Sequence, residues 1–289
     1  MSARSVTRRR HARTHAERLA SRDGYFAPES VIRRVGNSPL TPVLGGGVAT
    51  LLQVAHPLVA AGVALHSAYR GDLWHRLERT LRALYLITFG TKEEAERAAE
   101  AVRAVHARVR GRLDVQLGCF PPGTPYAASD PDLMLWVHAT LVEASLTVSQ
   151  RFVWALSTAE QERYYREMAV VARLFGTPEG VIPRSLAEFR AYFTAQLAGE
   201  TITVTPPARD VAAVILEAPL PRPLRVLVPA HRLATAGQLP PRLRREYGLR
   251  WTPLHALALP LAARSLRLTA GPALLAASHL APLRGELAA

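Results

Sequence analysis

The chain has almost no cysteine and almost no lysine. Cys119 is the single cysteine in 289 residues, which excludes disulfides within the chain and any zinc or iron–sulfur cluster held by several of its thiolates. Among 36 basic residues, Lys92 is the one lysine and the rest are arginines. Apolar residues make up 49% of the chain and charged residues 20%. This balance excludes a disordered protein and predicts a globular one with a substantial core.

Acidic residues are scarce in two arginine-rich segments. Residues 1–22 and 222–250 each hold seven arginines and one glutamate, so each contributes +6 to the net charge of +13. We predict a flexible basic arm over residues 1–24 and one domain over residues 25–289. The arm lacks the apolar run of a secretory signal, so we expect a cytoplasmic protein. The two arginine-rich segments either form solvated surface or make a peripheral membrane contact. Because no nucleic-acid-binding motif accompanies them, we expect no specific nucleic acid as a partner.

Strand patterns are nearly absent, and residues 201–205 (TITVT) are the best strand candidate. Helix starts are frequent: three capping boxes begin at Thr91, Ser157 and Ser185, each with a glutamate three residues later. Helices are predicted at about 42–66, 72–89, 92–113, 131–155, 158–175, 186–197, 208–217, 223–236, 240–247 and 254–280. We therefore predict an all-α fold, a single multi-helix domain.

Residues 43–65 carry no charge and are long enough to span a bilayer. A spanning helix would have to bury the Gly-Gly-Gly run at 45–47, Gln53 and the break at His56-Pro57 in lipid. A helix that is apolar on all sides is equally expected at the centre of a helical domain. We favour the buried core helix.

Several catalytic motifs are missing. The chain has no Glu-x-x-His, His-Glu-x-x-His, Gly-x-Ser-x-Gly, phosphate loop or Gly-x-Gly-x-x-Gly, which argues against a ferritin-like di-iron bundle, zincins, α/β-hydrolases and nucleotide-binding folds. Cys-x-x-Cys-His is also missing, so that motif attaches no haem.

Three histidines lie in apolar surroundings. His106 is on the alanine and valine stripe of the predicted helix 92–113, where a flat, bulky group has room beside the imidazole. His138 lies in an apolar stretch from Leu133 to Val148, and His56 precedes Pro57, which frees the carbonyl of Gln53. For each, the alternative to a ligand is a structural histidine hydrogen-bonded in the core, for His138 through neighbours such as Thr140 or Ser145.

Arginines border the apolar face of the predicted helix 72–89. Arg76 and Thr80 are four residues apart, and Arg79 lies beside Thr80. An arginine next to a buried face needs an anion, which is either a carboxylate of a neighbouring helix or the carboxylate or phosphate of a ligand.

Four segments occur in an order and spacing that resemble a known family: GGGVATLLQVAHPLVAAGVALHS (45–67), WHRLERTLRAL (74–84), VRAVHARVRG (102–111) and DLMLWVHATLVEAS (132–145). Over about residues 30–250 the chain resembles the oxygenase MpaB family, the rubber-oxygenase catalytic domain to which latex clearing protein belongs. The resemblance implies an all-helical fold that holds haem b without covalent attachment.

The resemblance also implies residue roles. His106 matches the axial ligand of the haem iron, Arg76 and Thr80 match an Arg-x-x-x-Thr pair, and Arg79 stands where a lysine approaches the distal side. Arg76, Arg79 or Arg110 would bind the haem propionates. His138 and His56 would line the cofactor site.

The implied function is that of a haem-dependent oxygenase, an oxidoreductase that uses dioxygen on an apolar substrate such as an isoprenoid or other alkene. Leu65 stands where many relatives carry an acidic residue before the His-Ser pair. This departure leaves open a haem-binding sensor or carrier, or a member without turnover. A third interpretation is a basic helical protein that binds nucleic acid or a membrane surface.

Overall fold

The structure, a computed structural model, describes residues 14–66, 69–217, 225 and 228–277. In this part of the chain the α-helices are α1 (His15–Ala20), α2 (Val31–Asn37), α3 (Leu40–Val54), α4 (Pro57–His66), α5 (Tyr69–Phe89), α6 (Lys92–His106), α7 (Pro131–Val148), α8 (Thr158–Phe175), α9 (Leu186–Ala198), α10 (Pro206–Glu217), α11 (Val228–Gln238), α12 (Pro241–Glu246) and α13 (Pro253–Ala277). A π-helical turn (Ser149–Val153), a 3-10 turn (Glu179–Val181) and two short strands, β1 (Arg110–Arg112) and β2 (Pro125–Ala127), complete the described elements. The predicted all-α fold is confirmed.

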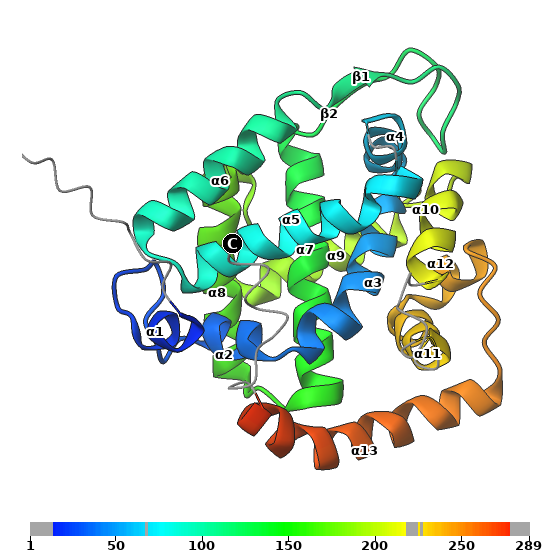
Figure 1. The fold of residues 1–289 in the computed structure, drawn as a ribbon. Helices are drawn as coiled ribbons and strands as arrows, with labels where there is room; N and C mark the ends of the chain where they lie inside the picture. The colour runs from blue at the N-terminus through cyan, green and yellow to red at the C-terminus, as the bar shows by residue number, and fades with distance from the viewer. Residues whose placement is uncertain (1–13, 67–68, 218–224, 226–227, 278–289) are drawn as a thin grey trace, which may run out of the picture.

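Helices α3 and α7 pack against each other at the centre of the molecule, and the other helices surround this pair (Figure 1). α2, α6 and α8 lie on one side, α10, α11 and α12 lie on the other, and α5 crosses in front of α7 in this view. The buried α3 residues Val48, Leu51 and Leu52 belong to the main hydrophobic core. Residues 43–54 therefore form a core helix, as the sequence analysis favoured.

The predicted helix 42–66 is two helices, because the chain turns at His56-Pro57. α3 and the first residues of α4 meet at an angle of 106°. The indole nitrogen of Trp136 donates to the carbonyls of Leu52 and Gln53 at 3.2 and 3.3 Å, which satisfies the end of α3. Among the described residues no single helix is long and apolar enough to cross a membrane, and the bent α3–α4 pair passes that test by length and composition alone.

The predicted helix 92–113 ends early, at His106. The chain then forms an antiparallel hairpin in which Gly111 of β1 lies opposite Tyr126 of β2. A Cβ atom at Gly111 would lie 2.6 Å from the Tyr126 hydroxyl, so the close approach of these strands requires glycine. The alanine and valine spacing of a helix continues past His106 in the sequence, but the contacts of the hairpin determine the structure there.

The strand expected at residues 201–205 is not formed. The backbone of this segment bonds other partners: the amide of Thr203 donates to the carbonyl of Ala55 at 2.8 Å, and that of Val204 to the Glu246 carboxylate at 2.9 Å. The segment thus connects the end of α3 to α12.

Two short helices, α1 and α2, were not expected, and α1 lies in the predicted basic arm. Residues 14–24 include α1, which begins with a capping box formed by Thr14 and Glu17. The buried Arg18 guanidinium binds the Glu94 carboxylate through two hydrogen bonds of 2.6 and 2.9 Å. This part of the expected arm is therefore attached to the body at the start of α6.

Candidate functional site

Helix α7 has two buried faces with different neighbours. Trp136 and Ala144 point toward α3: the indole reaches the end of α3, and a Cβ atom at Gly45 would lie 3.7 Å from the Cβ of Ala144. His138, Ser145 and Ser149 follow the spacing of a different face. The histidine predicted from the apolar stretch thus lies on the side of α7 turned away from Trp136.

His138 is a buried imidazole that lacks hydrogen-bond partners among the described residues. The residue is 5% exposed, and within the described ranges neither Nδ1 nor Nε2 has a donor or acceptor. The hydroxyls suggested by its sequence neighbours are used elsewhere, because Thr140 donates to the carbonyl of Val137 at 2.7 Å and Ser145 is hydrogen-bonded to Tyr164. Burial lowers the pKa of His138 to about 4, so the ring is neutral at pH 7 and presents an available nitrogen lone pair.

His106 is the last residue of α6 rather than a mid-helix residue, and it is half-buried. Side chains of α6 and α7 come together at the end of α8, where a Cβ atom at Gly176 would lie within 4 Å of both Arg103 and Met134. His106 follows Arg103 by three residues, and His138 follows Met134 by four. Both imidazoles therefore lie on helix faces that border this junction.

His56 has a structural role that the sequence left open. It precedes α4, and its Nδ1 accepts a hydrogen bond from the amide of Leu58 at 3.3 Å, as an N-cap side chain does. The ring stacks on Phe120, with centroids 5.7 Å apart. Burial lowers the pKa of His56 to about 4, so its Nδ1 can remain an acceptor.

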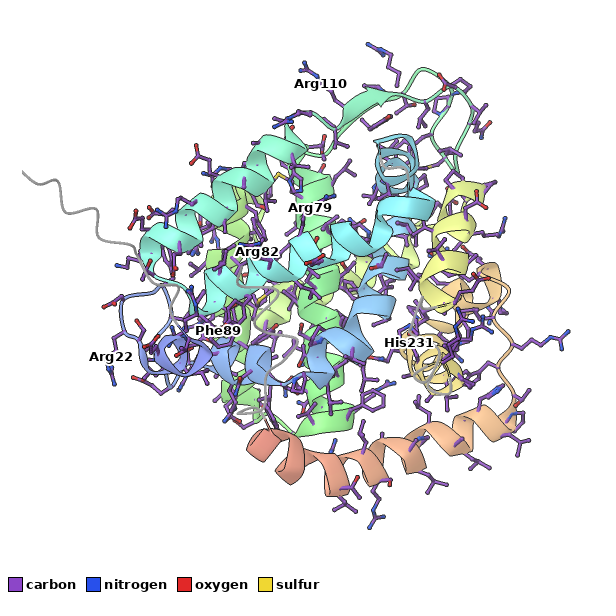
Figure 2. All side chains as sticks on the ribbon, in the orientation of Figure 1. Arg22, Arg79, Arg82, Phe89, Arg110 and His231 are labelled. Carbon is purple, nitrogen blue, oxygen red and sulfur yellow. The ribbon has the colours of Figure 1, made fainter. Side chains whose placement is uncertain are left out.

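The predicted arginine cluster is only partly brought together. Positions 76, 79 and 80 share one face of α5; Arg79 and Thr80 are exposed, and the side chain of Arg76 lies outside the described residues. Figure 2 shows Arg79 on α5 and Arg110 on the hairpin, outside the helical body. These two arginines are well separated, so they do not form one anion site.

Sequence reasoning missed two buried polar residues on the side of α7 that carries His138. Ser149 is 1% exposed, begins the π-helical turn, and its hydroxyl has no partner in the described part of the chain. Tyr164 of α8 is buried, which raises the pKa of its phenol, and it is held by Ser145. The spacing 138, 145, 149 inside an apolar helix is the pattern that could have identified this polar face.

Metal binding by a cluster of side chains finds no support in the described ranges, since no three His, Cys, Asp or Glu residues there are close enough to hold an ion. A macrocycle that carries its own metal needs only one ligand from the protein, so it does not require such a cluster.

Comparisons with known proteins give one result. A search of curated proteins found no match, and a search of solved structures found none either. The family model described as "ER-bound oxygenase mpaB/B'/Rubber oxygenase, catalytic domain" matches residues 33–268, which contain every candidate residue discussed above. This match covers most of the chain and supports an oxidoreductase-type enzyme. The chain therefore belongs to the mpaB/rubber oxygenase catalytic-domain family.

Proposed function

We propose that this protein is a haem b-dependent oxygenase that uses dioxygen to oxidise an apolar substrate, such as an isoprenoid or another alkene. The observation that carries the proposal is the buried imidazole of His138, whose two nitrogens have no protein partner in the described residues. An unsatisfied buried polar group costs about 1–3 kcal/mol. A cofactor, substrate or ordered water that bonds this ring would remove that cost.

Buried or half-buried polar groups on α6, α7 and α8 support the proposal of a haem group between these helices. His106 supplies an imidazole at the C-terminal end of α6, where the helix dipole favours positive charge next to the ring. His138 and Tyr164 supply buried polar groups on adjacent helices. Haem, when bound, would supply the iron at which dioxygen is activated.

We assign distinct roles to these side chains. His106 would hold the haem iron through its imidazole, in keeping with the resemblance of VRAVHARVRG to the family. His138 is neutral at pH 7. Its ring would form one hydrogen bond with the bound group and would add no positive charge to the site. Arg79, together with Arg76, provides the positive charge that propionates require.

The test is spectroscopic. The full chain is purified, reconstituted with haemin and compared with His106→Gly and His138→Leu; His255→Ala, a change at the start of α13, is the matched control. We expect a Soret band in the wild type and the control. His106→Gly should lose or shift that band, and free imidazole should restore it. His138→Leu should keep the bound haem but change the ferrous–CO spectrum.

Four outcomes contradict parts of the proposal. A wild-type protein that binds no haem overturns haem dependence. A His106→Gly variant with the wild-type spectrum overturns the ligand assignment, and loss of haem in His138→Leu alone transfers it to His138. Haem binding without substrate-dependent oxygen uptake, across a panel of alkenes and isoprenoids, contradicts oxygenase turnover and favours a sensor or carrier.

A further inference from the structure

Helix α13 is apolar on two opposite sides. Leu259 and Ala263 are buried against the π-helical turn and α11. Leu254, Leu257, Leu261 and Leu268 are 76%, 66%, 68% and 68% exposed. They are three, four and seven residues apart, so they form one line along the helix, here named the leucine stripe. Figure 1 shows α13 along the outer edge of the molecule, with the stripe's helix remote from the β1–β2 hairpin.

Such a stripe is unusual on a solvated helix, where the face opposite the core normally carries charged residues. Isolated exposed leucines are common, but four in line over about four helical turns make an extended apolar surface. This surface needs a partner that is itself apolar.

The charges next to the leucine stripe are all positive. The sequence has no aspartate or glutamate between Glu246 and Glu286. Arg264 is exposed and lies three residues after Leu261, at the margin of the stripe. Arg250 is exposed just before the helix begins. A partner must therefore combine an apolar interior with negative charge at its surface.

We propose that α13 binds the surface of an anionic lipid bilayer, with the leucine stripe inserted among the acyl chains and Arg264 at the level of the phosphates. Helices of this kind lie in the plane of the interface and gain affinity from both buried apolar area and anionic lipid. A second copy of this chain fits less well. Each copy has a net charge of +13, so contact between two leucine stripes would bring arginines together with no carboxylate beside either stripe to offset their repulsion. The proposal does not depend on haem or on oxygenase activity.

Vesicle sedimentation tests this surface with the full chain. The probes are vesicles of phosphatidylcholine alone and vesicles that also contain phosphatidylserine. The variants are Leu257→Ser/Leu261→Ser and Arg264→Gln. Val115→Ser is the matched control, because Val115 is equally exposed (61%) but lies in the loop of the hairpin. All four positions are exposed, so thermal unfolding should show that each variant folds.

We expect the wild type and Val115→Ser to bind the anionic vesicles. The double leucine variant should bind at least about tenfold more weakly. Each leucine side chain that enters lipid increases the affinity for the vesicle by a factor of about ten. Arg264→Gln should bind several-fold more weakly, and the wild type should lose affinity as salt rises. No binding to anionic vesicles overturns the proposal, as does equal binding by the leucine variant and Val115→Ser. A wild-type dimer that dissociates in the leucine variant also overturns it, because a second copy would then cover the stripe.

Discussion

Protonation of His138 should weaken the fold as the pH falls. In the unfolded chain a histidine titrates near pH 6.5, whereas burial lowers the pKa of His138 to about 4 in the folded protein. Between these two values the unfolded state binds a proton that the folded state does not, so stability decreases on acidification and levels off below about pH 4.

The magnitude follows from the separation of the two pKa values. Each pH unit below 6.5 costs about 1.4 kcal/mol while the folded ring stays neutral. At pH 5 the loss attributable to His138 is therefore about 2 kcal/mol, a large part of the total stability of an ordinary domain.

Urea unfolding of the wild type and His138→Leu at pH 7 and pH 5 measures this term. Carboxylates titrate in both proteins and cancel in the comparison, so the wild type should lose about 2 kcal/mol more than the variant. His56→Leu should remove a similar pH-dependent term, because burial lowers the pKa of His56 to about 4 as well. Identical pH dependence of His138→Leu and the wild type would refute the assignment of a neutral, buried imidazole.

Two further predictions concern helix α3. Gly47→Ala should destabilise the protein by about 1–2 kcal/mol, because the new Cβ would lie 2.8 Å from the Thr235 hydroxyl. Gly46→Ala should stabilise it by up to about 1 kcal/mol, because its new Cβ meets nothing within 4 Å. Thermal melts of both variants check the contrast, and equal shifts of the melting temperature would contradict it. Trp136→Phe should cost at least about 1–2 kcal/mol in chemical denaturation, because the carbonyl of Leu52 loses its indole donor and the smaller phenyl ring fills less of the core; an unchanged midpoint would contradict this.

Helix starts were predictable because they depend on local chemistry. Thr91 and Ser157 accept hydrogen bonds from the amides of Glu94 and Glu160, and both glutamates bond back, so α6 and α8 begin where the capping boxes predicted. At Ser185 only the first of the two bonds forms, yet α9 still begins at the next residue. One cap hydrogen bond is enough when an apolar helix face follows.

The end of α6 was not predictable in the same way. Val102, Val105 and Val109 continue the spacing of a helix face, but Val105 is exposed and the chain has already left the helix before Val109. The hairpin is held by bonds to distant residues, such as that from the amide of Ala128 to the carbonyl of Val109 at 2.8 Å. Long-range pairing of this kind leaves no local pattern, so the position of His106 at a helix end required the structure.

Burial alone does not separate a structural histidine from a functional one. His56 and His138 are both buried, and both have pKa values near 4. They differ in their hydrogen bonds: Nδ1 of His56 accepts from Leu58, whereas both nitrogens of His138 lack partners in the described part of the chain. A proline after a histidine is visible in the sequence and favours a cap, but the lack of a partner emerges only when every neighbouring hydroxyl and carbonyl is traced. His138 is therefore the residue whose substitution best distinguishes a ligand-binding site from ordinary core packing.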